Sequence, residues 1–493
     1  MSGMRELRDA FGSNSRFRAV SLGGAALFLS LLAAAVMLVP GPAPLALLAG
    51  AAGVAAFFLR PAPVLLGFFV LRIWLDLLWW LPFKVGSLNL MELYTGGVTA
   101  LCGVLFLLEI RRLAAHPALV FFAPYVLVLI VGGARNFELR SAVEIFARYL
   151  SPLLIGFLVA GFMDTRERRR RFFVVTALVC AVPVALSVFH LLNGQMRTYT
   201  LAGYNRLLGG YKNLHGHALS MFLIAAMATW WWFEASTRAK RAAIALYGGA
   251  AAICLYFTYV RTGLLALAVF GATLLWIEKR QRLLFAGGLA LAVFVLLNPA
   301  MQDRFKDFVL IFAPDENVLA TRKIGSGRFG IWSAAIGEYL RQSPLDIVMG
   351  LGIGGHFLLT REAFNPYSMA SDGNVDAHSD YLTMTFQVGP VATLSYLAMQ
   401  VQALRCGLDV HRRSPDPFMR RVGAFVVAMS IGATVANVVS NSFINRITQS
   451  WMFWSLCGLV FAEWMALRRE GRLGAPAPAA PRPGAAPAPA PQP

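Results

Sequence analysis

Runs of about 20 apolar residues recur along almost the whole chain, and short connections between them carry most of the charged residues. Such runs are long enough to cross the hydrocarbon core of a bilayer as α-helices. The pattern predicts about fourteen spans. They cover residues 20–39, 43–59, 63–82, 88–110, 118–134, 142–163, 171–193, 214–235, 241–259, 262–278, 283–299, 378–404, 422–440 and 447–467. The second and third spans are short and flanked by prolines, so the alternative is a re-entrant hairpin and twelve spans.

The same pattern divides the chain into four parts of an all-α, polytopic membrane protein. They are an N-terminal membrane domain (1–299), a large external loop with short helices (300–377), the C-terminal spans (378–467) and a disordered cytoplasmic tail rich in Ala and Pro (468–493). The tail cannot form a packed core, so we assign it no chemistry.

Composition and charge indicate a membrane protein and its topology. Hydrophobic residues make up 58% of the chain and charged residues 14%, which is far from soluble-protein norms. The net charge of +19 would favour a nucleic-acid partner in a soluble domain, but here the basic residues lie in connections between spans. With the N-terminus in the cytoplasm, 27 of the 44 Lys and Arg residues lie inside. This favours a multi-pass membrane protein with both termini in the cytoplasm, in contact with lipids and not with nucleic acid.

The cysteines and one internal charge pair have structural interpretations. All five cysteines fall inside spans or at a cytoplasmic edge, without a CxxC pair, so we expect neither disulfides nor a metal site. Arg72 and Asp76 are spaced i, i+4 within an apolar run and are expected to form an ion pair.

Two external segments carry the candidate chemistry. The first, residues 194–213, is short, basic and aromatic and leads into a span through His215-Gly-His217. Its candidate substrate-binding residues are Arg197, Arg206, Tyr211, Lys212, Asn213 and His217. The second is the 300–377 loop, in which Ser326-Gly327 precede a predicted helix. Its expected apolar face is Trp332, Ala335, Ile336, Tyr339 and Leu340.

Arginines at the predicted external face suggest an anionic ligand. Arg328 falls in the first turn of the predicted loop helix, where the helix dipole disfavours a cation unless an anion is near. Arg261 lies in a tight junction between two spans, and Arg148 lies near the outer end of another. Arginine binds phosphate in a bidentate manner, so converging arginines suit a diphosphate. The alternative is that such arginines are interfacial anchors.

A polar segment opens the span that follows the loop. It contains Asp376, His378, Asp380 and Tyr381, and it places a titratable imidazole where a lipid-linked substrate could meet water. The alternative for His378 is a structural hydrogen bond at a helix N-terminus. The glycines between Gly350 and Gly355 predict a turn, because they follow no strand and lack the Lys-Ser/Thr element of a phosphate loop.

Together these motifs resemble the O-antigen ligase and O-antigen polymerase superfamily over residues 195–465. The resemblance lies in the order of Val260-Arg261-Thr-Gly263, Gly-Arg328-x-x-x-Trp332, Ser343-Pro344, Gly350-Leu-Gly352-Ile-Gly354 and Ala377-His378-Ser-Asp-Tyr381-Leu, with Gly389 following and Gly210-Tyr-Lys-Asn213 preceding. The family often has His-Asn where this chain has His378-Ser379, so Asp376 or Asp380 is a candidate for the role of the missing amide.

The resemblance implies a membrane glycosyltransferase that acts at the periplasmic face without a metal or other cofactor. Its donor would be a glycan on undecaprenyl diphosphate, and its acceptor another glycan or a lipid A core. By similarity, Arg261 and Arg328 contact the diphosphate, and His378 lies at the acceptor hydroxyl as a base or an orienting group. These three residues are the predicted catalytic set, and a flippase or a chain-length regulator is a possible partner.

The choice between polymerase and ligase depends on the acceptor. A phosphorylated lipid A core would favour a basic external loop, but residues 300–377 hold seven basic residues against nine acidic ones. This favours a polymerase of O-antigen or exopolysaccharide repeat units, although the basic 194–213 segment restrains that preference. A polytopic transporter is the alternative from another class. Against it, we find no internal repeat, and the polar residues gather at one face.

Overall fold

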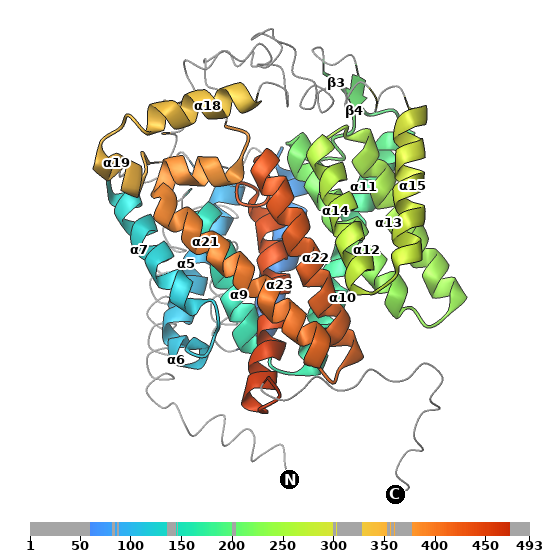
Figure 1. Ribbon diagram of the computed structural model, residues 1–493, viewed down its shortest axis with the longest axis horizontal. Helices are drawn as coiled ribbons and strands as arrows, with labels where there is room; N and C mark the ends of the chain where they lie inside the picture. Colours follow the sequence, from blue (N-terminus) through green and yellow to red (C-terminus); the bar gives the residue numbers. More distant parts are fainter. Residues whose placement is uncertain are drawn as a thin grey trace, which may run out of the picture.

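A computed structural model of the chain is almost entirely helical, which confirms the all-α membrane fold (Figure 1). The structure describes residues 60–80, 84–85, 88–135, 144, 146–199, 204–298, 302, 328–352, 355, 359 and 377–473. The first two predicted spans and the C-terminal tail lie outside these residues. Two short antiparallel hairpins are present, β1 (Lys84–Val85) with β2 (Leu88–Asn89), and β3 (Arg197–Tyr199) with β4 (Tyr204–Arg206).

Each of the twelve predicted spans that falls in the described region corresponds to one helix or to two consecutive helices. In order they are α4 (Pro61–Leu75) with η1 (Asp76–Leu78), α5 (Leu90–Leu108), α7 (Leu119–Arg135), η2 (Phe146–Leu150) with α9 (Ser151–Phe162), α10 (Arg166–Val179) with α11 (Ala181–Leu192), α12 (Leu214–Glu234), α13 (Arg238–Phe257), α14 (Arg261–Ile277), α15 (Gln281–Leu297), α21 (Asp380–Arg413), α22 (Pro417–Val439) and α23 (Ile447–Arg469). The short α6 (Ile110–Leu113) follows α5. By length and composition alone, five described helical segments could cross a membrane, namely α4 with η1, α5, α10 with α11, α22 and α23.

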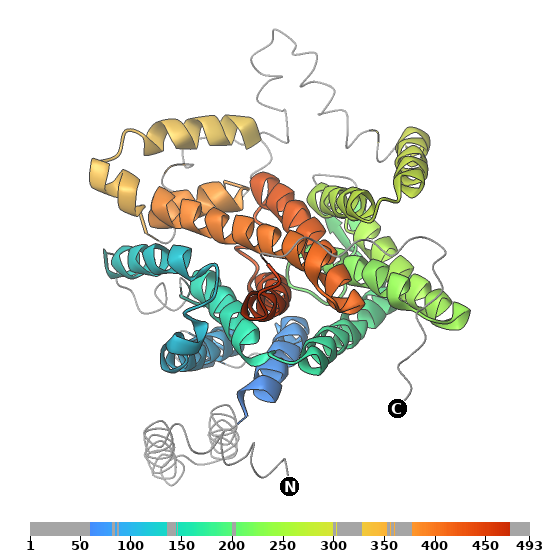
Figure 2. The ribbon, with the colours of Figure 1, turned by 60° about the horizontal axis from the view of Figure 1, so that its bottom comes forward.

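Helix α23 lies at the centre of the bundle, surrounded by α9, α21, α22 and α12 (Figures 1 and 2). Most of its side chains are buried. Glycines allow it to approach α9 closely, because a Cβ on Gly156 would lie 2.8 Å from the Trp454 carbonyl oxygen. A Cβ on Gly458 would lie 2.5 Å from the carbonyl oxygen of Gly156. Both contacts fall below the normal limit, so small residues set this helix pair.

Helix α21 is broken near its start, and the 300–377 loop fills the break. Gly389 has a φ of 84°, and Pro390 has no N–H to donate. The freed carbonyl oxygens of Phe386 and Gln387 accept hydrogen bonds from the backbone of Leu351 (2.8 Å) and Gly352 (3.0 Å). A Cβ on Gly350 would lie 2.5 Å from the backbone of Gln387, so only glycine allows the two backbones to approach this closely.

The loop contributes two described helices, α18 (Arg328–Tyr339) and α19 (Pro344–Met349). α18 lies across one end of the bundle (Figure 1). The predicted helix is present, but its predicted apolar face is partly wrong. Ile331, Ala335 and Tyr339 are buried, whereas Ile336 and Leu340 are exposed. The reason is the i, i+4 spacing of the three buried residues, which places Ile336 and Leu340 just outside the stripe that faces the protein.

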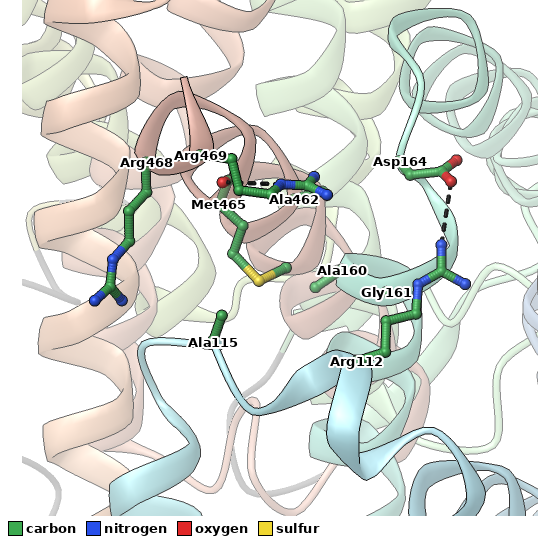
Figure 3. Close-up of a pocket in the computed structure, with 9 residues that line it drawn as sticks. All are labelled: Arg112, Ala115, Ala160, Gly161, Asp164, Ala462, Met465, Arg468 and Arg469. Carbon is green, nitrogen blue, oxygen red and sulfur yellow. Dashed lines mark hydrogen bonds and ion pairs between the residues drawn. The ribbon is translucent and has the colours of Figure 1, made fainter. Parts of the chain in front are cut away.

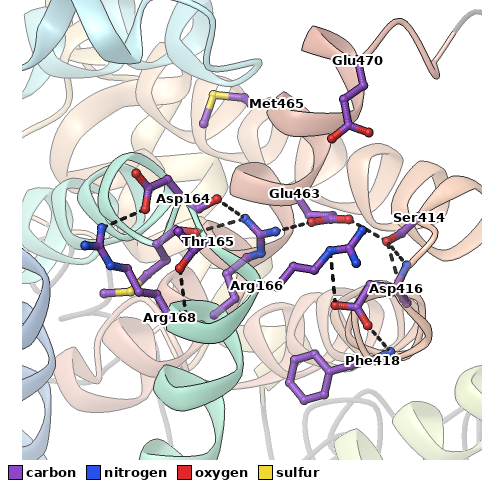
Figure 4. A network of polar contacts seen from close by, with 12 residues as sticks. Asp164, Thr165, Arg166, Arg168, Ser414, Asp416, Phe418, Glu463, Met465 and Glu470 are labelled. Carbon is purple, nitrogen blue, oxygen red and sulfur yellow. Dashed lines mark hydrogen bonds and ion pairs between the residues drawn. The ribbon is translucent and has the colours of Figure 1, made fainter. Parts of the chain in front are cut away.

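A buried ion pair ties helices together at the other end of the bundle. Arg169 of α10 and Glu463 of α23 lie 2.6 Å apart and are almost fully buried. The second oxygen of Glu463 accepts a hydrogen bond from Ser414, in the turn between α21 and α22 (2.6 Å; Figure 4). Arg169 also donates to the carbonyl oxygens of Met163 and Asp164. The two charges are therefore paired within the protein, and of the Arg169 nitrogens Nε alone has no hydrogen-bond partner among the described residues.

The predicted internal charge pair is confirmed. Arg72 and Asp76 form the expected i, i+4 ion pair at 3.4 Å. The five cysteines are all free and buried.

Candidate functional site

The N-terminal ends of several helices meet at the end of the bundle beneath α18 (Figure 1). Arg261 is the first residue of α14 and Arg328 the first residue of α18. Arg446 is the N-cap of α23, and His215 is the second residue of α12. Helix N-termini carry partial positive charge, so cations at these positions add to it. We call the set Arg206, His215, Arg261, Arg328, His378 and Arg446 the polar cluster.

Electrostatic interactions connect the members of the polar cluster. The positive charges of Arg446, Arg328 and Arg206 all act on His215, and His378 acts on it as well. Arg261 acts on Arg328 in turn. The two arginines and the histidine predicted as catalytic are thus brought into one region, although 117 positions separate Arg261 from His378 in the sequence.

Arg328 is held in a position that suits an anion. Burial, and then the charge of Arg261, lower its pKa from 12.5 to about 10, so it remains a cation at neutral pH. One of its terminal nitrogens donates to the carbonyl oxygen of Val439, the last residue of α22 (2.5 Å). A guanidinium has five N–H donors, so this single bond is compatible with a bidentate phosphate contact.

His378 was predicted to begin a helix, and this is wrong by two residues. α21 begins at Asp380, and Ser379 is its N-cap. The His378 φ of 50° is in the left-handed region, which costs about 1–2 kcal/mol for a residue with a Cβ. Both neighbours are anchored, because the Ala377 carbonyl oxygen accepts from the Trp332 indole (2.7 Å) and Ser379 bonds to the Asn437 carbonyl oxygen (3.4 Å). The surrounding structure therefore imposes the strained backbone.

Asp380 holds the loop between α22 and α23. Its carboxylate is fully buried and accepts backbone hydrogen bonds from Ser442 (2.7 Å), Ile444 (2.9 Å) and Asn445 (3.2 Å). The Asn445 side chain adds a fourth bond. The carboxylate lies within a cage of loop donors, so it positions Arg446, the residue that follows. The predicted contact of Asp380 with substrate stays a prediction.

Arg148 also contacts the loop between α22 and α23. It donates to the Asn445 side-chain oxygen (2.9 Å) and pairs with Glu144, one turn earlier. Arg148 is therefore linked to the polar cluster through the neighbour of Arg446.

The 194–213 segment separates into two groups. Arg197 and Arg206 face each other across the β3–β4 pair, and Arg206 belongs to the polar cluster. His217 is fully buried, bonds to Ser187 (2.9 Å) and the Leu207 carbonyl oxygen (3.0 Å), and stacks on Tyr211. Tyr211 and His217 therefore pack the segment against the bundle.

Most of the remaining predicted site residues are exposed or bond to residues of their own helix, and one lies outside the described residues. Asn213 caps α12, accepting from the backbone N–H groups of His215 and Gly216. Lys212 is exposed. The Tyr381 hydroxyl donates to Gln400 within α21 (2.7 Å). Asp376 lies outside the described residues. No group of three His, Cys, Asp or Glu residues in the described part of the chain could hold a metal ion, and metal independence remains a prediction.

Two members of the polar cluster, His215 and Arg446, are not among the predicted site residues. His215 lies two positions before the predicted His217, and only the contacts of each ring distinguish the two. Arg446 had a signal in the sequence, because it is a basic residue in a short connection on the face predicted to be external. A basic residue that departs from the topology pattern is a candidate for ligand binding.

The fold and the polar cluster define a multi-pass membrane protein with a cationic site at one end. A family model described as O-antigen ligase matches residues 243–397, and this match confirms the resemblance to the O-antigen ligase and polymerase superfamily. The matched region runs from α13 into α21 and contains Arg261, Arg328 and His378. No curated protein matches the chain. The match covers 155 of the 493 residues and shows that this region is similar to a family of glycan-assembly enzymes.

Proposed function

We propose that the protein transfers a glycan from undecaprenyl diphosphate to a sugar hydroxyl, at the periplasmic face of the inner membrane. The observation that carries this proposal is the polar cluster, in which four arginines and two histidines gather beside helix N-termini. Burial and mutual repulsion raise the free energy of such a cluster. A diphosphate would offset both effects, because it brings negative charge and oxygen acceptors to the same place.

The reaction that suits these groups is a single in-line displacement. The acceptor hydroxyl oxygen forms a bond to the anomeric carbon of the donor, while the bond from that carbon to the diphosphate oxygen breaks. The bonding electron pair leaves with the diphosphate, where Arg261 and Arg328 stabilise the developing charge. The hydroxyl proton passes to His378 acting as a base. Inversion at the anomeric carbon follows from the single step.

Among acceptors we propose another repeat unit, which makes the protein a polymerase. The support is the slight acidic excess of residues 300–377, since a phosphorylated lipid A core would prefer a basic loop. A ligase is the second candidate, and the basic residues Arg197 and Arg206 of the β3–β4 pair favour it. The O-antigen ligase description of the matched family is compatible with either acceptor.

Deletion of the gene and analysis of the surface glycan test the proposal. For a polymerase we expect single repeat units on the lipid anchor or core, whereas full-length chains left on the carrier lipid would identify a ligase. Complementation with His378→Ala should fail and complementation with wild type should succeed, at equal membrane levels of the two proteins. An unchanged surface glycan in the deletion strain would refute the proposal.

A further inference from the structure

A second basic site lies at the end of the bundle opposite the polar cluster. Figure 3 shows this site in close-up. It is a pocket of about 360 Å³ between the ends of α9 and α23 and the connection after α6. Arg112, Arg468 and Arg469 line it together with Asp164. The apolar part of the lining is formed by Ala115, Ala160, Gly161, Ala462 and Met465. By the count of basic residues, this end is predicted to be cytoplasmic.

Aromatic rings hold two of the arginines. The Arg112 guanidinium lies 5.2 Å from the centre of the Phe162 ring, and that of Arg468 lies 5.7 Å from the centre of the Trp464 ring. Stacking fixes the plane of a guanidinium while its N–H groups still point outward. In the view of Figure 3, Arg468 and Arg112 lie on opposite sides of the pocket, with Met465 between them. The pocket is thus bordered by oriented cations and has an apolar part between them.

The charge of the pocket is only partly balanced by its own lining. Asp164 bonds to Arg112 (3.1 Å) and also to Arg168 (2.8 Å), which lies outside the lining. Arg469 bonds through Nε to the Met465 carbonyl oxygen (3.3 Å), a bond that does not use its two terminal nitrogens. Three lining cations therefore stand against one lining carboxylate, which is itself shared with a fourth cation.

We propose that this pocket binds the phosphate headgroup of an anionic phospholipid from the cytoplasmic leaflet. A phosphodiester suits the arginines, and the glycerol and first acyl carbons suit the apolar lining beside Met465. The level in the membrane also fits, because the pocket lies where membrane helices end and where Trp464 marks an interface. An inorganic phosphate would satisfy the arginines but would leave the apolar lining uncovered, so we favour the lipid.

Native mass spectrometry of the full chain, purified in neutral detergent, tests the proposal. The probes are phosphatidylglycerol and phosphatidylcholine with identical acyl chains, and inorganic phosphate serves as the competitor. The test variant carries Arg468→Gln with Arg469→Gln. The control carries Arg171→Gln with Arg412→Gln, which removes two exposed charges from the same end without touching the pocket.

We expect wild type and control to retain phosphatidylglycerol in preference to phosphatidylcholine, and the test variant to bind it about tenfold more weakly or worse. Equal binding by the test and control variants would overturn the proposal. Equal retention of the two lipids by wild type would also overturn it. Displacement of the lipid by inorganic phosphate at the same concentration would mean a site for free anions instead of a lipid site.

Discussion

Two arginines at opposite ends of the bundle, Arg169 and Arg328, are held in different ways. At the end with Arg169, the charge is fully buried and lies against Glu463, with further acceptors from the backbone. At the other end, Arg328 bonds to a backbone carbonyl oxygen, and the charge that acts on it most strongly is that of another arginine. In the first arrangement the charge of the arginine is balanced by a carboxylate of the protein itself. The second is stabilised when an anion arrives, which is the expected difference between an arginine that holds a fold and one that binds substrate.

The buried pair should show the largest effect, and this effect should be on stability. Arg169→Ala or Glu463→Ala leaves a buried charge without its partner, which costs about 3–5 kcal/mol. We expect thermal unfolding in detergent at a clearly lower temperature for either variant. The double variant Arg169→Met with Glu463→Met should recover part of the loss, because it leaves no buried charge. A double variant as unstable as the single ones would contradict this interpretation.

Arg328→Ala should lower glycan transfer by about 10²–10³-fold, since it removes a donor from the developing negative charge. The measurement is transfer from a polyprenyl diphosphate donor by purified protein. Arg341→Ala is the matched control, because Arg341 follows the same helix and is exposed, with Glu338 as its partner. Unlike Arg169→Ala, the Arg328 variant should unfold close to the wild-type temperature. Full activity of Arg328→Ala would remove it from the site.

A change at Asp380 should affect both stability and activity. Its carboxylate holds the loop between α22 and α23, and this loop positions Arg446 of the polar cluster. Asp380→Asn replaces one acceptor oxygen by a donor and should cost about 1–3 kcal/mol of stability. Transfer by the folded fraction should also fall. We expect the fall mainly as a higher KM for the donor, because Arg446 is proposed to lie at the diphosphate. Glu167→Gln, an exposed carboxylate at the other end, is the control. A stability loss with unchanged KM would limit Asp380 to the fold.

His378 permits a smaller test that separates strain from chemistry. Glycine tolerates a φ of 50°, whereas alanine does not, so His378→Gly should be more stable than His378→Ala by about 1 kcal/mol. Both variants should lack transfer activity. Thermal unfolding and the transfer assay on the two proteins check this. Equal stability would indicate that the left-handed backbone costs nothing.

A chelator should have the smallest effect. The cationic end is proposed to stabilise the diphosphate with arginines, so transfer should survive EDTA. The assay compares the purified protein with and without EDTA and then with Mg²⁺ restored. Loss of activity that only a divalent cation reverses would mean that the arginines do not suffice.

Much of the fold could be predicted from the sequence because apolar runs have a direct physical meaning in a membrane. Helices such as α14 and α22 fall where the runs do. The break in α21 was harder to predict. Gly389 and Pro390 indicate that the helix is interrupted, but they do not indicate which segment packs there. The partner, Gly350 to Gly352, lies almost forty residues earlier, and only packing in three dimensions reveals the match.

The site was predictable where a residue violates a local rule. Arg328 in a first helical turn and Arg261 in a short junction both do so, and both lie in the polar cluster. Asp380 violates no rule in the sequence, because an acidic residue in the first turn of a helix is favourable. Its role depends on a loop sixty residues later, which the helix bundle brings to it.

The Trp332 indole ties α18 directly to the residue before His378, and the glycine turn ties the loop to α21 a second time. The separation between Arg328 and His378 is therefore set by these two attachments and not by the length of the chain between them. The connection between Gly352 and Ala377 could therefore change in length during evolution without moving either group, as long as the buried Leu359 keeps its place in the cluster with Ala335 and Tyr339. Related proteins could in this way acquire different acceptors while the chemistry at the diphosphate stays the same.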